Sequence, residues 1–276
     1  MSEVNAPRAD TGWDCHAHLF GPYERFPLAA DRSYTPPEAI DTQYQALLTR
    51  LGLSNGVLVH PSAYGKDHSL LLHALDAHPN LRGVIVVRPG TLATLDGLRD
   101  KGVRAARFSH RSGAGANFAG SASLDDLLAL APRLADAGLH AELWTDCKAL
   151  TDIAPRLRSL PVAVVIDHMG GFDVARGIDD AGFRCLLALL EERKASVKLC
   201  AYRNLLGTSD FELGRPFHDA MLKANPEGLV WGSDWPHLRV TPAPDTVGLL
   251  DVLKRWTPEP ALREKILVSN PRALYA

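Results

Sequence analysis

The regular alternation of short apolar runs with amphipathic segments constrains the fold of this chain more than any other feature. This rhythm is typical of repeated strand–helix units. The expected strands lie at residues 12–20, 56–61, 81–87, 103–108, 140–145, 162–169, 196–202 and 228–234. The expected helices lie at residues 38–51, 68–78, 92–101, 124–137, 146–159, 180–193, 216–224, 246–256 and 259–268.

The expected strands are continuous apolar runs, as in sheets that are covered by helices on their faces. Eight strand–helix units predict a single-domain (β/α)₈ barrel over residues 12–276, preceded by a disordered or extended arm at 1–11. An open, doubly wound sheet is the rival architecture. It normally carries a glycine-rich phosphate turn after its first strand, and His16-Ala17-His18 stands at that place. We therefore expect the barrel.

Composition narrows the class of protein. The chain has 276 residues, of which 46% are hydrophobic and 22% charged, enough for one large core. A net charge of −2 predicts no general attraction to nucleic acid or to a membrane surface. The polar residues 1–11 do not resemble a signal peptide, and no run approaches 18 apolar residues. Four cysteines without a C-x-x-C pair suggest a reduced, cytoplasmic compartment.

In (β/α)₈ barrels the chemistry takes place at the carboxyl ends of the strands. His16 and His18 share one face of the first strand, roughly 6–7 Å apart. His168 and Asp234 end the sixth and eighth strands. We predict these four as the catalytic group, with Asp234 as a general base whose pKa is raised by its apolar neighbours. The structural alternatives are a turn cap or an arginine pair for Asp234, and a core histidine for His168.

Substrate binding is expected from side chains around the same mouth. Arg107 and Arg203 are suited to hold carboxylates by bidentate pairing, and Arg88 is a further candidate. The loops at 21–37 and 109–121 are long enough to shape a binding site. The remaining candidates on flanking segments are Tyr34, Ser62 and His237, followed by the weaker Tyr64, His110 and Arg111.

Three motifs together resemble the amidohydrolase superfamily, and in particular its amidohydrolase 2 branch, which includes 2-pyrone-4,6-dicarboxylate lactonase and related sugar-acid lactone enzymes. They are Asp14-x-His16-x-His18, Asp167-His168-x-Gly170-Gly171 and Gly232-Ser233-Asp234-Trp235-Pro236. The ending at residues 269–275 resembles that branch as well. By this resemblance His16, His18, His168 and Asp234 fall on the active-site positions of the family.

The resemblance raises the question of whether this protein binds a metal ion. Most superfamily members hold one or two divalent metals with these positions, together with a Lys or Glu from the fourth strand and a His from the fifth. Here the fourth strand ends at Arg107 and the fifth at Trp144, while His140 stands at the opposite end of its strand. The lactonase branch is known to work without metal, so we expect no metal. The alternative is a single divalent ion such as zinc, held by His16, His18, His168 and Asp234.

The resulting hypothesis is a hydrolase that opens a small lactone bearing at least one carboxylate. Asp234 activates water, the three histidines polarise the ring carbonyl, and Arg107 and Arg203 anchor the substrate. Alternatives are a metal-dependent lactonase, a lactone isomerase, an aromatic-acid decarboxylase and a non-catalytic acid-binding barrel. The expected partner is the small anionic lactone alone, and a homo-oligomer stays open.

Overall fold

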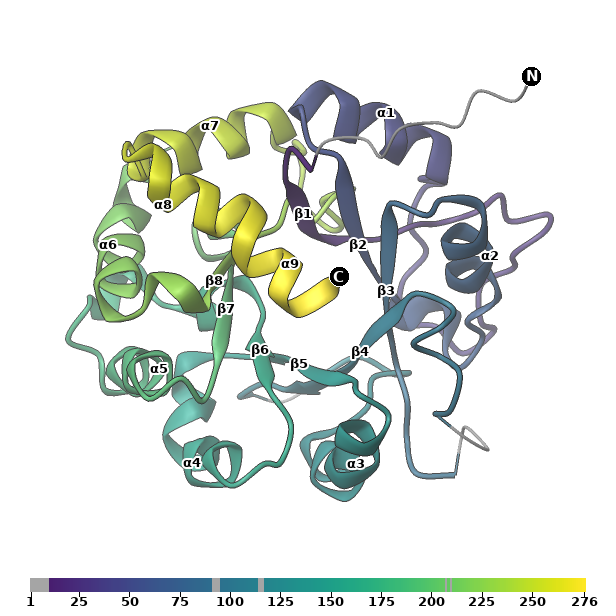
Figure 1. Ribbon diagram of the computed structural model, residues 1–276, viewed down its shortest axis with the longest axis horizontal. Coiled ribbons are helices and arrows are strands. Elements are labelled where there is room, and N and C mark those ends of the chain that lie inside the picture. Colours follow the sequence, from purple (N-terminus) through teal and green to yellow (C-terminus); the bar gives the residue numbers. More distant parts are fainter. Residues whose placement is uncertain (1–9, 91–94, 114–116, 207, 209) are drawn as a thin grey trace.

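The computed structural model describes residues 10–90, 95–113, 117–206, 208 and 210–276. Eight parallel strands are paired in chain order, as Figure 1 shows, so the predicted (β/α)₈ barrel is confirmed. The strands are β1 (Trp13–Ala17), β2 (Asn55–Val59), β3 (Leu81–Ile85), β4 (Val103–His110), β5 (His140–Thr145), β6 (Val164–Ile166), β7 (Ser196–Leu199) and β8 (Leu229–Trp231).

The barrel closes where the segment after β8 meets β1. The backbone N–H of Asp234 donates to the carbonyl of His16 over 2.7 Å, and that of His18 donates to Trp235 over 2.8 Å. Beside them, the buried carboxylate of Asp14 accepts the backbone N–H and the hydroxyl of Ser233 over 2.7 and 2.6 Å. This closure places Asp234 directly beside the two histidines of β1.

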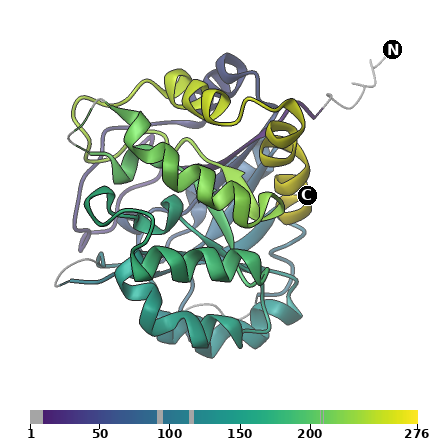
Figure 2. The same cartoon turned by 90° about the vertical axis from the view of Figure 1, so that its left-hand side faces the viewer.

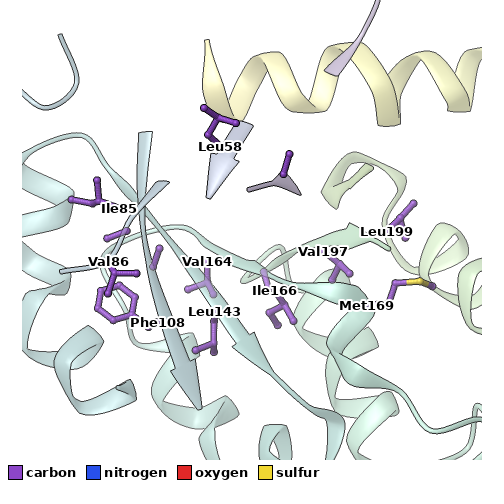
Figure 3. Close-up of a cluster of buried hydrophobic side chains, with 14 of the residues drawn as sticks. Leu58, Ile85, Val86, Phe108, Leu143, Val164, Ile166, Met169, Val197 and Leu199 are labelled. Atoms are coloured by element: carbon purple, nitrogen blue, oxygen red, sulfur yellow. The ribbon is translucent and has the colours of Figure 1, made fainter. Parts of the chain in front are cut away.

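Helices surround the sheet in a ring, as the two views in Figures 1 and 2 show. They are α1 (Asp41–Leu51), α2 (Ser69–Ala77), α3 (Leu124–Asp136), α4 (Cys147–Arg158), α5 (Ala181–Glu191), α6 (Arg215–Ala224), α7 (Thr246–Trp256), α8 (Pro260–Glu264) and α9 (Asn270–Tyr275). Strand residues such as Leu143, Ile166 and Val197 belong to the apolar core shown in Figure 3. In the described part of the chain, every helix is too short or too polar to cross a lipid bilayer.

Several boundaries differ from the expectation. The helix expected at 92–101 is not formed in its described part, where residues 96–102 make turns; residues 91–94 lie outside the described residues. Strands β6, β7 and β8 end earlier than expected, at Ile166, Leu199 and Trp231. Short turns follow two of them: a left-handed turn at His168–Gly171 and a 3₁₀ turn at Ala201–Asn204. The expected arm at 1–11 is described only from residue 10.

The carboxyl-terminal segment forms more structure than the sequence suggested. The helix expected at 259–268 continues through a π-helical turn, Lys265–Ser269, into α9. The ring of Tyr275 packs with Trp13, Val57 and Val230 in a second buried cluster. Its hydroxyl donates to Oε1 of Glu142 over 2.7 Å. The end of the chain therefore closes one end of the barrel and reaches a buried carboxylate in its interior.

Candidate active site

The four residues predicted as a catalytic group converge at one place. Asp234 Oδ1 lies 3.4 Å from Nε2 of His18 and 3.7 Å from Nε2 of His16, and Oδ2 lies 3.6 Å from Nε2 of His168. All four side chains are buried. His18, His168 and Asp234 line a cavity of about 590 Å³, and His16 lies directly behind them. The rings of His16 and His18 do lie on one side of β1, with their centres 5.0 Å apart, closer than the spacing expected from strand geometry alone.

The two oxygens of Asp234 have different environments. Oδ2 accepts the hydroxyl of Tyr202 over 2.7 Å and also pairs with Nε of Arg203. Among the described residues, Oδ1 faces the two histidines of β1. Burial opposes ionisation of Asp234, but the Arg203 guanidinium and His168 outweigh it and hold the pKa of this carboxyl well below its ordinary value. The expectation of a raised pKa is therefore wrong, because Arg203 compensates the charge.

Backbone and side-chain contacts fix two of the histidines. Nδ1 of His18 donates to the carbonyl of Val59 over 2.7 Å, since a carbonyl can only accept, and Nε2 is thereby aimed at Asp234. His168 begins a left-handed turn, with φ of 50° for His168 and 54° for Met169, and Asn204 donates to the His168 carbonyl over 2.9 Å. Burial lowers the pKa of His168. Both ring nitrogens of His168 lack a hydrogen-bond partner among the described residues.

A group of buried charges lies beneath the histidines. Lys198 pairs with Glu142 Oε2 at 2.5 Å and Asp167 Oδ1 at 3.4 Å, and Arg107 donates to Asp167 Oδ2 over 2.9 Å. Burial opposes ionisation of Glu142, but Lys198 lowers its pKa to about 2. The pKa of Asp167 is held well below its ordinary value, because Lys198 and Arg107 outweigh its burial.

Sequence reasoning missed Lys198 and Glu142 as parts of the site. Each is a charged residue inside an apolar strand, Val197–Leu199 or Ala141–Leu143, and that pattern was the available signal. Asp167 and Tyr202 stood at predicted strand ends but had no assigned role.

The predicted binding residues divide into two groups. Arg107, Arg203, Tyr34 and Ser62 line the cavity. His237 does not: it lies behind Tyr202, with ring centroids 5.2 Å apart, and Nε2 is 2.8 Å from the hydroxyl of Thr246.

The weaker candidates divide in the same way. Arg111 lines the cavity, with its guanidinium 4.4 Å from the ring centre of Trp144, while that of Arg107 is 5.2 Å away. Arg88 donates instead to the carbonyl of Ser121, and Tyr64 and His110 lie outside the cavity lining. Trp144 thus lies at the mouth end of β5, and the guanidinium groups of Arg107 and Arg111 both lie against its ring.

Comparison with known proteins assigns this architecture. Residues 13–276 match the family model described as amidohydrolase, of the amidohydrolase 2 type. The chain belongs to the amidohydrolase 2 family. It is 32% identical to a 4-sulfomuconolactone hydrolase of Rhizobium radiobacter, over 95% of this chain and 89% of that protein. It is 31% identical to a 2-pyrone-4,6-dicarboxylate hydrolase of Comamonas testosteroni, with the same coverage.

A solved structure agrees with these sequence relatives. A protein from Pseudomonas putida, provisionally described as a 2-pyrone-4,6-dicarboxylic acid hydrolase, superposes with a TM-score of 0.80 at 30% identity. The alignment covers 96% of this chain and 97% of that one. The family resemblance seen in the three sequence motifs is confirmed over nearly the whole chain.

Proposed function

We propose that this protein hydrolyses a small lactone that carries carboxylate groups, with Asp234 as the general base and without a metal ion. The observation that carries the proposal is the asymmetry of Asp234. Oδ2 is held by Tyr202 and Arg203, while Oδ1 faces the histidines of β1. A carboxylate fixed at one oxygen and open at the other is suited to take a proton from a water molecule.

We assign the three histidines two further roles, orienting the water and polarising the carbonyl group. Because Nδ1 of His18 donates to Val59, the neutral ring accepts at Nε2, and we assign it to orienting the water beside Asp234 Oδ1. His16 and His168 present buried ring nitrogens without partners among the described residues, and we assign them to the carbonyl oxygen of the lactone. Water adds to the carbonyl carbon as its proton passes to Asp234. The ring C–O bond then breaks, and the proton returns to the departing oxygen.

Two arginines are suited to bind the carboxylates. Arg107 and Arg203 line the cavity, and Nη2 of Arg203 makes no hydrogen bond within the described part of the chain. A substrate carboxylate on Arg203 shares the positive charge that holds down the pKa of Asp234. We therefore expect substrate binding to make Asp234 more basic when the water is in place.

His16, His168 and Asp234 each place one donor atom within 4.8 Å of the others, so their positions alone could hold a metal ion. The fifth strand and the charges around the site argue against the divalent ion that the superfamily implies. Trp144 takes the place of a fifth-strand ligand, and Asp234 is already compensated by Arg203. Three cations compensate the three carboxylates at the cavity floor. Arg203 pairs with Asp234, Arg107 with Asp167, and Lys198 with Glu142 and Asp167. The negative charge that would bind a dication is therefore already neutralised. These observations support chemistry carried by the side chains alone.

Two of the relatives named above support the substrate class, since they are described as hydrolases of 4-sulfomuconolactone and of 2-pyrone-4,6-dicarboxylate. The test is Asp234→Asn, assayed on both lactones by loss of the ring and by identification of the product. Removal of a general base predicts a fall in kcat of about 10²–10⁴-fold, with lactone affinity measured by calorimetry retained. A rearranged lactone as the product would instead identify an isomerase.

A matched control is Asp245→Asn, which removes a carboxylate that caps α7 and does not line the cavity. It should turn over lactone as the wild type does. If Asp234→Asn keeps both turnover and affinity, Asp234 is not the base. If the wild type binds lactones without opening them, the protein is a binder rather than an enzyme.

A further inference from the structure

Lys198 lies beneath the histidines and does not line the cavity, and the chemistry proposed above assigns it no role. Its side chain is fully buried in β7. The ammonium faces Glu142 Oε2 at 2.5 Å, His16 Nδ1 at 3.2 Å and Asp167 Oδ1 at 3.4 Å. An ammonium has three N–H donors and no lone pair, so it is the donor in each hydrogen bond that it makes.

The contact with His16 determines which ring nitrogen carries the proton. Nδ1 must present its lone pair to the ammonium, so the neutral ring carries its hydrogen on Nε2. Asp167 Oδ1 is the competing partner, 3.3 Å from the same nitrogen. That oxygen has no hydrogen-bond partner among the described residues, whereas the contact between Lys198 and His16 has hydrogen-bond geometry. The geometry therefore favours the Lys198 ammonium, rather than Asp167, as the hydrogen-bond partner of His16 Nδ1.

We propose that Lys198 is a positioning residue that holds His16 in the tautomer with hydrogen on Nε2. Nε2 is buried and has no partner among the described residues, 3.7 Å from Asp234 Oδ1. An N–H at this place stabilises negative charge that develops on a carbonyl oxygen, whereas a lone pair repels it. The proposal rests on the lactone hydrolysis above only for the identity of this acceptor.

The surroundings explain why the ammonium stays in place. Glu142 Oε2 is its nearest partner, and the other oxygen of Glu142 accepts the hydroxyl of Tyr275 over 2.7 Å. The carboxylate is thus held from both sides, and it holds Lys198 under His16. Without the ammonium, Nδ1 of His16 has Asp167 Oδ1 as its remaining acceptor, and the ring hydrogen is expected to move from Nε2 to Nδ1.

The direct test is nuclear magnetic resonance of the wild-type protein with ¹⁵N-labelled histidine, with His16 assigned by comparison with His16→Gln. Long-range ¹H–¹⁵N spectra distinguish a protonated ring nitrogen from one with a lone pair. We expect His16 to show a protonated Nε2 and a lone pair on Nδ1. The opposite tautomer in the wild type overturns the proposal, and this readout needs no substrate.

A charge-balanced variant tests the role of Lys198 itself. Lys198→Met combined with Glu142→Gln removes one positive and one negative charge together, so a buried charge imbalance is avoided. We expect the tautomer of His16 to invert and kcat to fall by about 10²–10³-fold, as on loss of one oxyanion donor, with KM within a few fold. Glu142→Gln alone retains Lys198 and should keep the wild-type tautomer.

The outcomes separate this inference from the proposed function. A double variant that keeps the wild-type tautomer, or that inverts it with kcat unchanged, overturns the role of Lys198. A wild-type protein that opens no lactone contradicts the proposed function alone, because the ring tautomer is still read directly by resonance.

Discussion

The hydroxyl of Tyr202 donates to Oδ2 of Asp234 over 2.7 Å, while the histidines of β1 face Oδ1. Tyr202 is buried and lies one residue before Arg203, which pairs with the same oxygen. Burial and the charge of Asp234 raise the pKa of the Tyr202 phenol, so the hydroxyl stays a donor. One turn after β7 thus fixes the orientation of the carboxylate and keeps it ionised.

Tyr202→Phe should raise the pKa of Asp234, because the ionised carboxylate loses a hydrogen bond of about 1.5–3 kcal/mol. In the wild type this pKa lies well below 3.8. The acid limb of the profile of kcat/KM against pH should therefore move to higher pH in the variant. Tyr23→Phe is the control, since its hydroxyl bonds the Pro36 carbonyl outside the cavity lining. An acid limb that does not move would show that Tyr202 has no influence on the base.

Glu142→Gln should lower stability in a pH-dependent way. The pKa of Glu142 is lowered to about 2 by Lys198, despite burial, from an ordinary value of 4.5. A carboxyl with a lowered folded-state pKa stabilises the fold above about pH 4.5, and this stabilisation is lost as pH falls toward 2. We expect the variant to be less stable at pH 7 by about 3 kcal/mol, since one partner of a buried pair is removed.

Urea unfolding at pH 7, 4 and 3 measures this difference. The gap between wild type and Glu142→Gln should narrow as the pH falls, and a constant gap would contradict the ion pair. Glu212→Gln is the control, because its half-exposed carboxylate lies 3.5 Å from Arg255. Such surface pairs contribute at most about 1 kcal/mol.

Gly171→Ala should disturb the turn that carries His168. Gly171 has φ of +57°, and a Cβ there would lie 3.0 Å from Cβ of Asp146 and 3.1 Å from its Cα. We expect a loss of about 2 kcal/mol in unfolding free energy, from backbone strain and from this contact, together with reduced kcat. Gly177→Ala is the matched control, with φ of +72° and no atom within 4 Å. Equal losses of stability and activity in both variants would show that the contact with Asp146 contributes nothing to the effect.

Arg107→Lys should weaken substrate binding more than turnover. A lysine has no planar fork and cannot hold Asp167 through Nε while it presents further donors to a carboxylate. Loss of a charged hydrogen bond, about 1.5–3 kcal/mol, predicts a KM roughly 10–100-fold higher. Arg104→Lys in the same strand is the control, since Arg104 bonds the carbonyls of Arg99 and Ala276. An unchanged KM in Arg107→Lys would exclude Arg107 from carboxylate binding.

The sequence predicted the barrel and the proximity of His16, His18, His168 and Asp234, because both follow from local rules. Strand periodicity places alternate residues on one face, and parallel strands gather their carboxyl ends at one mouth. The roles assigned to these residues stay predictions. The family membership suggested by the motifs is confirmed by the comparisons.

The sequence could not predict how distant side chains would pair. Lys198 and Glu142 are 56 positions apart, and only the closed barrel brings their charges together beneath His16. The same limit explains the wrong pKa expectation for Asp234. The sequence shows the apolar neighbours of Asp234, but it does not show that the Arg203 guanidinium folds back onto the Asp234 carboxylate. The expected helix at 92–101 is not formed in its described part, where Gly97, and Gly102 directly after that range, adopt positive φ.

The central claim is that side chains alone carry the lactone chemistry, and metal analysis coupled to activity tests it most directly. The purified protein is analysed for bound metals, and hydrolysis of 2-pyrone-4,6-dicarboxylate and 4-sulfomuconolactone is measured before and after chelation. We predict less than about 0.1 equivalent of metal per chain and unchanged hydrolysis after chelation. About one equivalent of zinc, with activity lost on its removal and restored on its return, would contradict the account.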